Sequence, residues 1–388
     1  MNQDQIINYI FSLQTPEYGF YLQNKFKQRT LMSSSFAIMT LELIDAINLI
    51  NKEAHSAYLL SSQDSASGLF IDSNLNIDFK DILNLEKNYI SFQSTAFSLS
   101  ALDILGEKPK FSFNFLDTYR DKKFLEEWIC SLNWSNPWHE SNKIMFIMQF
   151  LSYENLCLNN KESKELIVFL LDILNNLIDR KTGLWGTDKG ASLFSAIAAA
   201  FHFYIFYQYF KKEIPCSNLV LDYTVSHQEL DGLFHPLGGG GACEDLDSIY
   251  IITQLAKDKK AVKSCLLNAY NSIINLQLQD GGFCWASRPN FPMNYGLKYL
   301  NIFSSSFHFG MFKWIVKKNI LGTFIPIFKD GKQYSYSNWC MMKYNINESD
   351  SWSTWFRLLA LAKIETIFPE FKDNDINFNF RPLPSLGY

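Results

Sequence analysis

Apolar residues recur at helical spacing through most of the chain, and the segments that carry them come in pairs joined by polar loops. The first segment of a pair ends near a turn glycine, which is followed by an apolar pair that is usually aromatic. Turns of this kind contain Gly19, Gly68, Gly183, Gly232 and Gly282. The pattern predicts a series of helical hairpins.

The turns recur at a nearly fixed spacing. Gly19 and Gly68 are 49 residues apart, Gly183 and Gly232 are also 49 apart, and Gly232 and Gly282 are 50 apart. From Gly68 to Gly183 there are 115 residues, about two periods with an insertion, and a further unit is expected around residue 134. A period this long indicates a repeat architecture, which predicts one large domain over residues 1–388.

Six hairpin units and a tail are expected. The units span about residues 1–50, 51–106, 120–155, 163–211, 218–257 and 260–366, and the tail spans 367–388. The expected helices cover residues 6–13 and 33–49, 53–60 and 93–105, 124–132 and 142–151, 165–178 and 192–209, 219–225 and 245–255, 261–278 and 304–316, and finally 351–364. In the third unit the segment 134–140 lies between the two helices. Six such pairs predict an all-α fold, a single (α/α)6 toroid with one helix of each pair inside and one outside.

The toroid predicts where a binding site lies. We expect the turns around one rim and the N-termini of the inner helices at the opposite, open rim. Free amides and the positive ends of the helix dipoles gather at such N-termini, which makes that rim the natural place for a ligand.

The composition permits a large core, with aromatic surface left to line a cavity: 47% of the residues are hydrophobic and 16% are aromatic. The net charge of −4 gives no reason to expect nucleic acid or an anionic membrane as a partner. Residues 193–210 carry no Asp, Glu, Lys or Arg and are about long enough to span a membrane. We expect a buried inner helix there, with a helix that spans or dips into a membrane, and so peripheral membrane contact, as the alternative.

The cysteine pattern indicates the compartment. The seven cysteines are odd in number and scattered, and no Cys-x-x-Cys occurs. The N-terminus has neither a basic region nor a long apolar run. Both observations favour a reducing compartment and a cytoplasmic protein.

The strongest candidate for chemistry is Cys243-Glu244-Asp245-Leu246-Asp247-Ser248, where three carboxylates follow a run of four glycines at the start of an apolar helix. If such a cluster is buried, desolvation and mutual repulsion raise at least one pKa and provide a proton donor near neutral pH. We therefore predict Glu244, Asp245 and Asp247 as catalytic residues. The alternative is plain capping by a solvated acidic turn.

Seven further residues are predicted to contact substrate because they lie near expected inner-helix starts, beside the glycine run or among aromatic residues: Trp138, His139, Glu140, His235, His308, Asp350 and Arg357. Each has a structural alternative. His139 and Glu140 are an acid–base pair or polar first-turn residues, and Asp350 alone is also a good cap. Arg357 either stacks on its aromatic neighbours or grips an anion.

Metal and cofactor sites are not predicted. Cys243, Asp245 or Asp247, and His308 contain atoms that can bind zinc, but no tight ligand pair occurs. The glycine run matches no nucleotide-binding pattern. Magnesium is expected only if the substrate is a diphosphate.

The stretch Leu276-Gln-Leu-Gln279-Asp280-Gly-Gly-Phe-Cys-Trp285 resembles the repeat of the terpene cyclase and protein prenyltransferase superfamily, whose fold is an α/α toroid. The resemblance implies that its Gln and Asp tie helices together and serve stability. In class II terpene cyclases an Asp-x-Asp-Asp motif at an inner-helix start protonates an alkene or epoxide. Asp245-Leu-Asp247-Ser248 is similar to that motif, with its last Asp replaced by Ser.

This resemblance puts Asp247 in the place of the acid, with Asp245 as its helper. The zinc motif of the prenyltransferase β subunit is Asp-x-Cys with a later His. Asp247-Ser248-Ile249 departs from it at the Cys, which argues against a zinc-dependent prenyltransferase.

Three functions stay open at this stage. The first is a terpene-cyclase-like enzyme, an isomerase or lyase acting on an apolar or isoprenoid small molecule. The second is a carbohydrate-active toroid, a glycoside hydrolase or polysaccharide lyase, that uses Glu244, Asp245 or Asp247 with His139 and Glu140. The third is a toroid that binds a ligand or protein without chemistry. The oligomeric state is not predicted.

Overall fold

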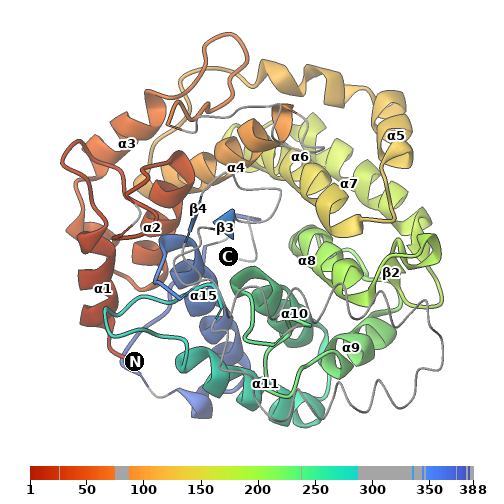
Figure 1. Cartoon of the computed structure of the whole chain (residues 1–388). Helices are drawn as coiled ribbons and strands as arrows, with labels where there is room; N and C mark the ends of the chain where they lie inside the picture. Colours follow the sequence, from red (N-terminus) through yellow and green to blue (C-terminus); the bar gives the residue numbers. More distant parts are fainter. Residues whose placement is uncertain are drawn as a thin grey trace.

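Six inner helices form a closed ring in the structure, a computed structural model (Figure 1). The residues described are 1–25, 27–74, 87–236, 238–286, 334–335, 343–344, 347–372, 374–381 and 383–384. The inner helices are α2 (Leu31–Leu43), α4 (Lys87–Leu105), α6 (Pro137–Cys157), α8 (Leu193–Tyr209), α10 (Ala242–Leu255) and α15 (Ser351–Ile367). Each packs against the next, and α15 packs against α2, which closes the ring.

Outer helices alternate with the inner ones along the chain and surround the ring (Figure 1). They are α1 (Gln3–Ser12), α3 (Lys52–Leu60), α5 (Lys122–Ser131), α7 (Lys161–Asn176), α9 (Ser217–Ser226) and α11 (Lys259–Ile274). This arrangement confirms the predicted all-α toroid.

Short elements join these helices. The 3-10 helices are η1 (Ile47–Leu49), η2 (Asn114–Arg120), η3 (Thr187–Lys189) and η5 (Pro369–Phe371). The antiparallel strand pairs are β1 (Ile178–Asp179) with β2 (Leu184–Trp185), and β3 (Tyr334–Ser335) with β4 (Lys343–Tyr344). In the view of Figure 1, β3 and β4 lie within the outline of the ring.

Sequence pattern separates the inner helices from the outer ones. Every residue of α2 is buried, whereas α5 buries only Leu125 and Ile129. A helix that is apolar on all sides belongs in the middle of a fold, and one with a single apolar stripe belongs on its outside. In α8 the whole stretch Ala196–Tyr207 is buried, which confirms the predicted inner helix at residues 193–210. Within the described part of the chain, no helix is long and apolar enough to cross a membrane.

The turn glycines adopt the left-handed backbone conformation that glycine tolerates best. The φ angles of Gly68, Gly183, Gly232 and Gly281 are +83°, +75°, +81° and +93°. In each of these turns the glycine lies two residues before the aromatic residue. The matching glycine of the last turn is therefore Gly281, and not Gly282 as the sequence suggested. The spacing from Gly232 to Gly281 is then 49 residues, the same as the spacing from Gly183 to Gly232.

Glutamine side chains hold three of these turns. Gln63 Nε2 donates to the carbonyl oxygens of Gly68 (3.1 Å) and Phe111 (2.9 Å). Gln228 Nε2 binds the Gly232 oxygen in the same way (2.8 Å), and Gln277 Nε2 binds the Gly281 oxygen (2.9 Å). These contacts agree with the stabilising role that the family resemblance implied for the motif, although the residue that acts in the last turn is Gln277.

The turns and the N-termini of the inner helices lie at the same rim, so the expectation of opposite rims was wrong. After each of four turns, the amide of the aromatic residue donates a hydrogen bond to a side chain in the inner helix that follows. The pairs are Phe20 with Ser34 (3.0 Å), Phe70 with Thr95 (2.9 Å), Phe234 with Asp245 (2.7 Å) and Phe283 with Thr354 (3.0 Å). The physical reason is that these hydrogen bonds hold the residues after each turn against the inner helix that follows.

The helix expected at 142–151 is longer at both ends, because α6 begins at Pro137, within the segment 134–140, and ends at Cys157. The helix expected at 304–316 lies outside the described residues, and α15 is the inner helix that packs against α11. The tail packs on the surface as expected, where Arg381 bonds to Glu42 (2.9 Å) and Asp103 (2.8 Å).

Candidate active site

The inner helices share a register that places Asp247 toward the middle of the ring. Ser34, Thr95 and Thr354 accept the turn amides, and two residues after each of them stands a phenylalanine, at positions 36, 97 and 356. The ring centroid of Phe36 lies 4.8 Å from that of Phe97 and 5.7 Å from that of Phe356, although the three side chains come from three different helices. Their positions therefore face inward.

Asp245 accepts the turn amide in α10, and two residues later stands Asp247. A carboxyl group thus occupies, in one repeat, the position that carries a phenyl ring in three others.

The carboxyl group of Asp247 is buried and has no hydrogen-bond partner among the described residues. The side chain is 2% exposed, and neither oxygen makes a hydrogen bond within the described residues. Burial raises the pKa of Asp247 well above its ordinary range, and the neighbouring carboxylates Glu244 and Asp245 raise it further. A neutral, protonated carboxyl group is the form that this environment favours.

Both carboxylate oxygens of Asp245, in contrast, accept hydrogen bonds. One oxygen accepts the amide of Phe234, and the other accepts the amide of Gly241 (3.0 Å) and the guanidinium of Arg357. Both partners of the ion pair are fully buried. Burial raises the pKa of Asp245, and Arg357 opposes that shift. Arg357 also donates to the backbone oxygen of Trp285 (2.7 Å).

Glu244 and the glycine run lie next to the ion pair of Asp245 and Arg357. Burial raises the pKa of Glu244 to about 7, and its Oε2 lies 3.2 Å from Cys243 Sγ. A Cβ atom on Gly241 would lie 2.3 Å from Glu244 Oε2, and one on Gly240 would lie 2.6 Å from the Asp245 carboxylate. A side chain at Gly240 or Gly241 would therefore crowd the buried acids, and the φ of +73° at Gly240 also favours glycine.

Two of the predicted binding residues meet at the rim around a residue that the sequence analysis did not single out. The ring of Phe194, at the start of α8, lies 5.4 Å from that of Trp138 and 5.8 Å from that of His235. All three side chains are half-buried. They form an aromatic cluster on the α6 and α8 side of the ring.

Other predicted residues are held by local contacts. His139 stacks on Tyr89 with ring centroids 5.1 Å apart, and Glu140 forms an ion pair with Lys143 (3.1 Å). Asp350 is the N-cap of α15 and accepts hydrogen bonds from the Ser353 amide (2.6 Å) and hydroxyl (2.7 Å). These contacts account for the three residues structurally, and their binding of substrate stays a prediction. His308 lies outside the described residues.

Sequence reasoning missed a second buried polar pair on the inner helices. Ser141 Oγ on α6 lies 2.8 Å from His202 Nδ1 on α8, and both residues are buried. Burial lowers the pKa of His202 to about 3, so the imidazole is neutral. The repeat spacing could have pointed to His202. It lies 49 residues, one repeat, before Ile251, and Ile251 follows Asp247 by one helical turn.

Metal ligands do not cluster in the part of the chain that the structure describes. No group of three His, Cys, Asp or Glu side chains there could hold a metal ion. The zinc set considered from the sequence includes His308, which is outside that part. The expectation of no cofactor, with magnesium only for a diphosphate substrate, stays a prediction.

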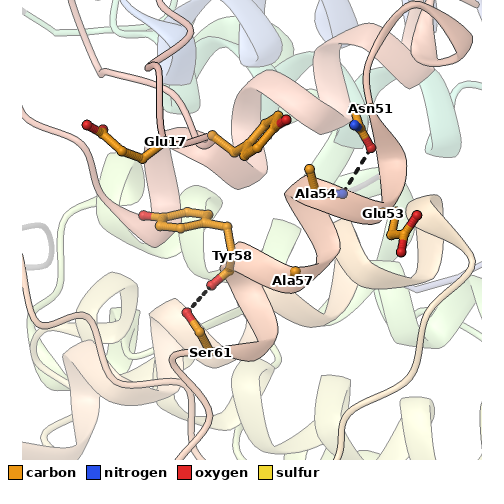
Figure 2. A pocket seen from close by; sticks show the side chains of 8 residues that line it. Glu17, Asn51, Glu53, Ala54, Ala57, Tyr58 and Ser61 are labelled. Carbon is orange, nitrogen blue, oxygen red and sulfur yellow. Dashed lines mark hydrogen bonds between the residues drawn. The ribbon is translucent and has the colours of Figure 1, made fainter.

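A surface pocket of about 530 Å³ lies between α3 and the turn that follows α1 (Figure 2). Its lining residues are Glu17, Tyr18, Asn51, Glu53, Ala54, Ala57, Tyr58 and Ser61. None of them belongs to the acid cluster or to the predicted substrate-binding residues, so this pocket does not define the candidate site.

The closed ring of paired helices, with a carboxyl group at an inward position, defines an α/α-toroid protein. Comparison with protein families gives the same result: the family described as the prenyltransferase alpha-alpha toroid domain matches residues 1–85 and 85–290. The chain belongs to this family. Searches of curated proteins and of solved structures gave no significant match.

Proposed function

We propose that the protein is a terpene-cyclase-like enzyme in which Asp247 donates the proton that starts the reaction of an isoprenoid or other apolar substrate. One observation carries the proposal: Asp247 is buried, lacks a hydrogen-bond partner within the described residues and occupies an inward position where three other repeats carry phenylalanine. Membership of the toroid family supports the same class of substrate.

The proposed chemistry uses the neutral form of the acid. Asp247 transfers its proton to one carbon of an alkene, the electron pair of the double bond forms the new C–H bond, and positive charge develops on the other carbon. An epoxide would be protonated on its oxygen. Burial raises the pKa of Asp247 and so favours the protonated form that the reaction needs. The aromatic rings of Phe36, Trp352 and Phe356 pack together on the inner helices, and aromatic rings of this kind stabilise a nearby cation.

The carbohydrate alternative has less support. It requires His139 and Glu140 to act with the carboxylates of α10, but His139 stacks on Tyr89 and Glu140 pairs with Lys143. A non-catalytic toroid makes a different prediction, because it would bind an apolar ligand and release it unchanged. Assays for turnover separate these functions.

The test is incubation in D2O with linear isoprenoid hydrocarbons, their epoxides and their diphosphates. Initiation by Asp247 places one deuterium in the product, which mass spectrometry detects. The Asp247→Asn variant should lose activity by about 10²–10⁴-fold, because the amide cannot supply the proton. Its melting temperature should change little, since Asn and a protonated Asp have nearly the same shape.

Asp222→Asn, on the exposed surface of α9, is the matched control and should keep full activity. Unchanged turnover in Asp247→Asn would exclude the acid role. A large loss of stability in that variant would favour a structural role for the carboxyl group. Oligosaccharide cleavage by the wild-type protein would favour the carbohydrate function.

A further inference from the structure

The first turn of the chain departs from the repeat at Tyr18. Four later turns have a glycine two residues before their aromatic residue, at positions 68, 183, 232 and 281. In the first turn the aromatic residue is Phe20, and the matching position holds Tyr18. The φ angle of Tyr18 is +63°, in the left-handed region that the turn glycines occupy. A bulky residue rarely adopts this conformation, and such strain is characteristic of functional sites.

The later turn glycines have no room for a side chain. A Cβ atom on Gly68 would lie 2.1 Å from the backbone oxygen of Ser112, and one on Gly281 would lie 2.3 Å from that of Gln5. The other two glycines are crowded in the same way, by the N-terminus of α9 and by α11. The corresponding place beside the first turn contains the side chain of Tyr18 and the surface pocket between this turn and α3.

This pocket has the size and the walls of a small-molecule site. Its volume of about 530 Å³ falls within the range of about 300–1,000 Å³ that is usual for such sites. Tyr58 reaches from α3 toward the turn, and its ring would lie 2.8 Å from a Cβ atom on Gly19 (Figure 2). Ala54 and Ala57 line the side formed by α3. Two tyrosine side chains and two small apolar residues therefore surround the space.

The charged groups of the lining favour a cation as the ligand. Two of the eight lining residues, Glu17 and Glu53, are acidic, and none of the eight is Lys, Arg or His. Arg29 pairs with Glu17 (3.4 Å), which balances that charge within the protein. Glu53 is exposed in the first turn of α3 and forms no ion pair with any residue that the structure describes. The carboxylate of Glu53 is thus available to a ligand of opposite charge.

The tyrosine rings add to this preference. The guanidinium of Arg29 lies over the ring of Tyr58, 5.1 Å from its centroid, so this ring already attracts one cation. The side chain of Tyr18 is 36% exposed and packs edge-on against His55, with ring centroids 5.5 Å apart. Aromatic faces beside a carboxylate are the usual surroundings of a bound ammonium group.

We propose that this pocket binds a small organic cation, an ammonium group with an apolar body, through Tyr18, Tyr58 and Glu53. The two rings and the carboxylate hold the charged group, and the apolar body packs against Ala54 and Ala57. The site is separate from the acids of α10. It also explains the strain at Tyr18, because a glycine there would form the turn without strain but would remove a ring from the pocket.

The test compares choline with 3,3-dimethylbutan-1-ol, in which a carbon atom replaces the charged nitrogen. Saturation-transfer NMR of the methyl protons, at low ionic strength, measures the binding of each probe to the wild-type protein. We expect choline to bind with a Kd of roughly 0.1–5 mM, and the neutral analogue to bind at least about tenfold more weakly.

Two variants locate the binding. Tyr18→Gly gives the first turn the residue of the four later turns, so its melting temperature should stay close to that of wild type while the Kd for choline rises at least about fivefold. Glu53→Gln should raise the Kd by a similar factor and reduce its dependence on salt. Glu126→Gln, on the exposed surface of α5, is the matched control and should bind choline as wild type does.

Equal binding of the two probes would overturn the proposal, because the pocket would then not select for charge. An absence of choline binding up to about 20 mM would overturn it as well. So would a Kd for choline that is unchanged in both Tyr18→Gly and Glu53→Gln, since the cation would then bind elsewhere. If Tyr18→Gly does not fold, Tyr18→Asn replaces it, because asparagine tolerates the left-handed conformation.

Discussion

Two inner helices, α15 and α10, begin in the same register, and four matched positions show how their polar groups are arranged differently. In α15 these are Asp350 at the N-cap, then Ser353, Thr354 and Phe356. The corresponding residues of α10 are Gly241, Glu244, Asp245 and Asp247. A carboxylate thus stands at the cap of α15, while α10 has no side-chain cap and carries carboxylates at the three later positions.

The difference shows how one repeat is adapted without a change of fold. Replacing a good N-cap by glycine costs only a few tenths of a kcal/mol, so the start of α10 is tolerated. Burying three carboxyl groups is far more unfavourable, and among the described residues only Asp245 forms an ion pair, with Arg357. A region that departs in this way from the local rules obeyed by its neighbours is characteristic of a functional site.

The largest effect is expected from breaking the buried ion pair. Arg357→Met should lower the free energy of unfolding by about 3–5 kcal/mol, because it leaves the Asp245 carboxylate buried without its cation. The double variant Asp245→Thr/Arg357→Met gives α10 the hydroxyl that α15 has at Thr354, and it should recover most of the loss. Urea unfolding measures both. A single variant as stable as wild type would show that the pair adds nothing to ring closure.

A smaller effect, dependent on pH, is expected from Glu244. Its pKa rises from 4.5 in ordinary surroundings to about 7 in the folded protein. Above pH 4.5 the folded state keeps a proton that the unfolded chain has released, so the contribution of Glu244 to stability falls as the pH rises toward 7. The loss amounts to about 3 kcal/mol over this range.

Glu244→Gln should remove this part of the pH dependence. The measurement is the free energy of unfolding of both proteins at several pH values between 4 and 8, and the quantity of interest is their difference. Ser353→Ala, at the matching position of α15, is the control and should shift stability equally at every pH. A difference between wild type and Glu244→Gln that stays constant with pH would mean that Glu244 ionises normally.

The smallest effects on stability are expected from the two glutamines of the last turn, Gln277 and Gln279, and they should differ. Gln277→Ala should cost about 1–2 kcal/mol, since the carbonyl oxygen of Gly281 loses its donor. Gln279 is exposed, and Gln279→Ala should change stability by less than about 0.5 kcal/mol. Thermal unfolding of the two variants side by side tests this, and equal losses would contradict the assignment of Gln277 as the residue that holds the turn.

The fold could be predicted because its signals are local and repeated. The turn glycines require a special backbone conformation, and the apolar faces of the helices follow directly from their sequence. The position of Asp247 at the start of an inner helix was also accessible, because a glycine run and an acidic cluster adjoin in the chain.

The contacts that give the site its properties were not accessible in this way. Asp245 and Arg357 are 112 residues apart, and only the closure of the ring brings them together. The rings of Phe36, Phe97 and Phe356 meet for the same reason. His202 gave no local signal, since a histidine within an apolar helix has the same appearance whether it fills the core or borders a cavity.

The closure of the ring between α2 and α15 has a consequence for synthesis of the protein. A linear array of repeats folds progressively, because each unit needs only its neighbour. Here the first inner helix to leave the ribosome, α2, packs against the last one, α15, and about 300 residues separate Leu43 from Ser351. At about 5–20 residues per second, the inner face of α2 waits at least about 15 seconds for its partner. We expect the nascent chain to bind chaperones during that interval.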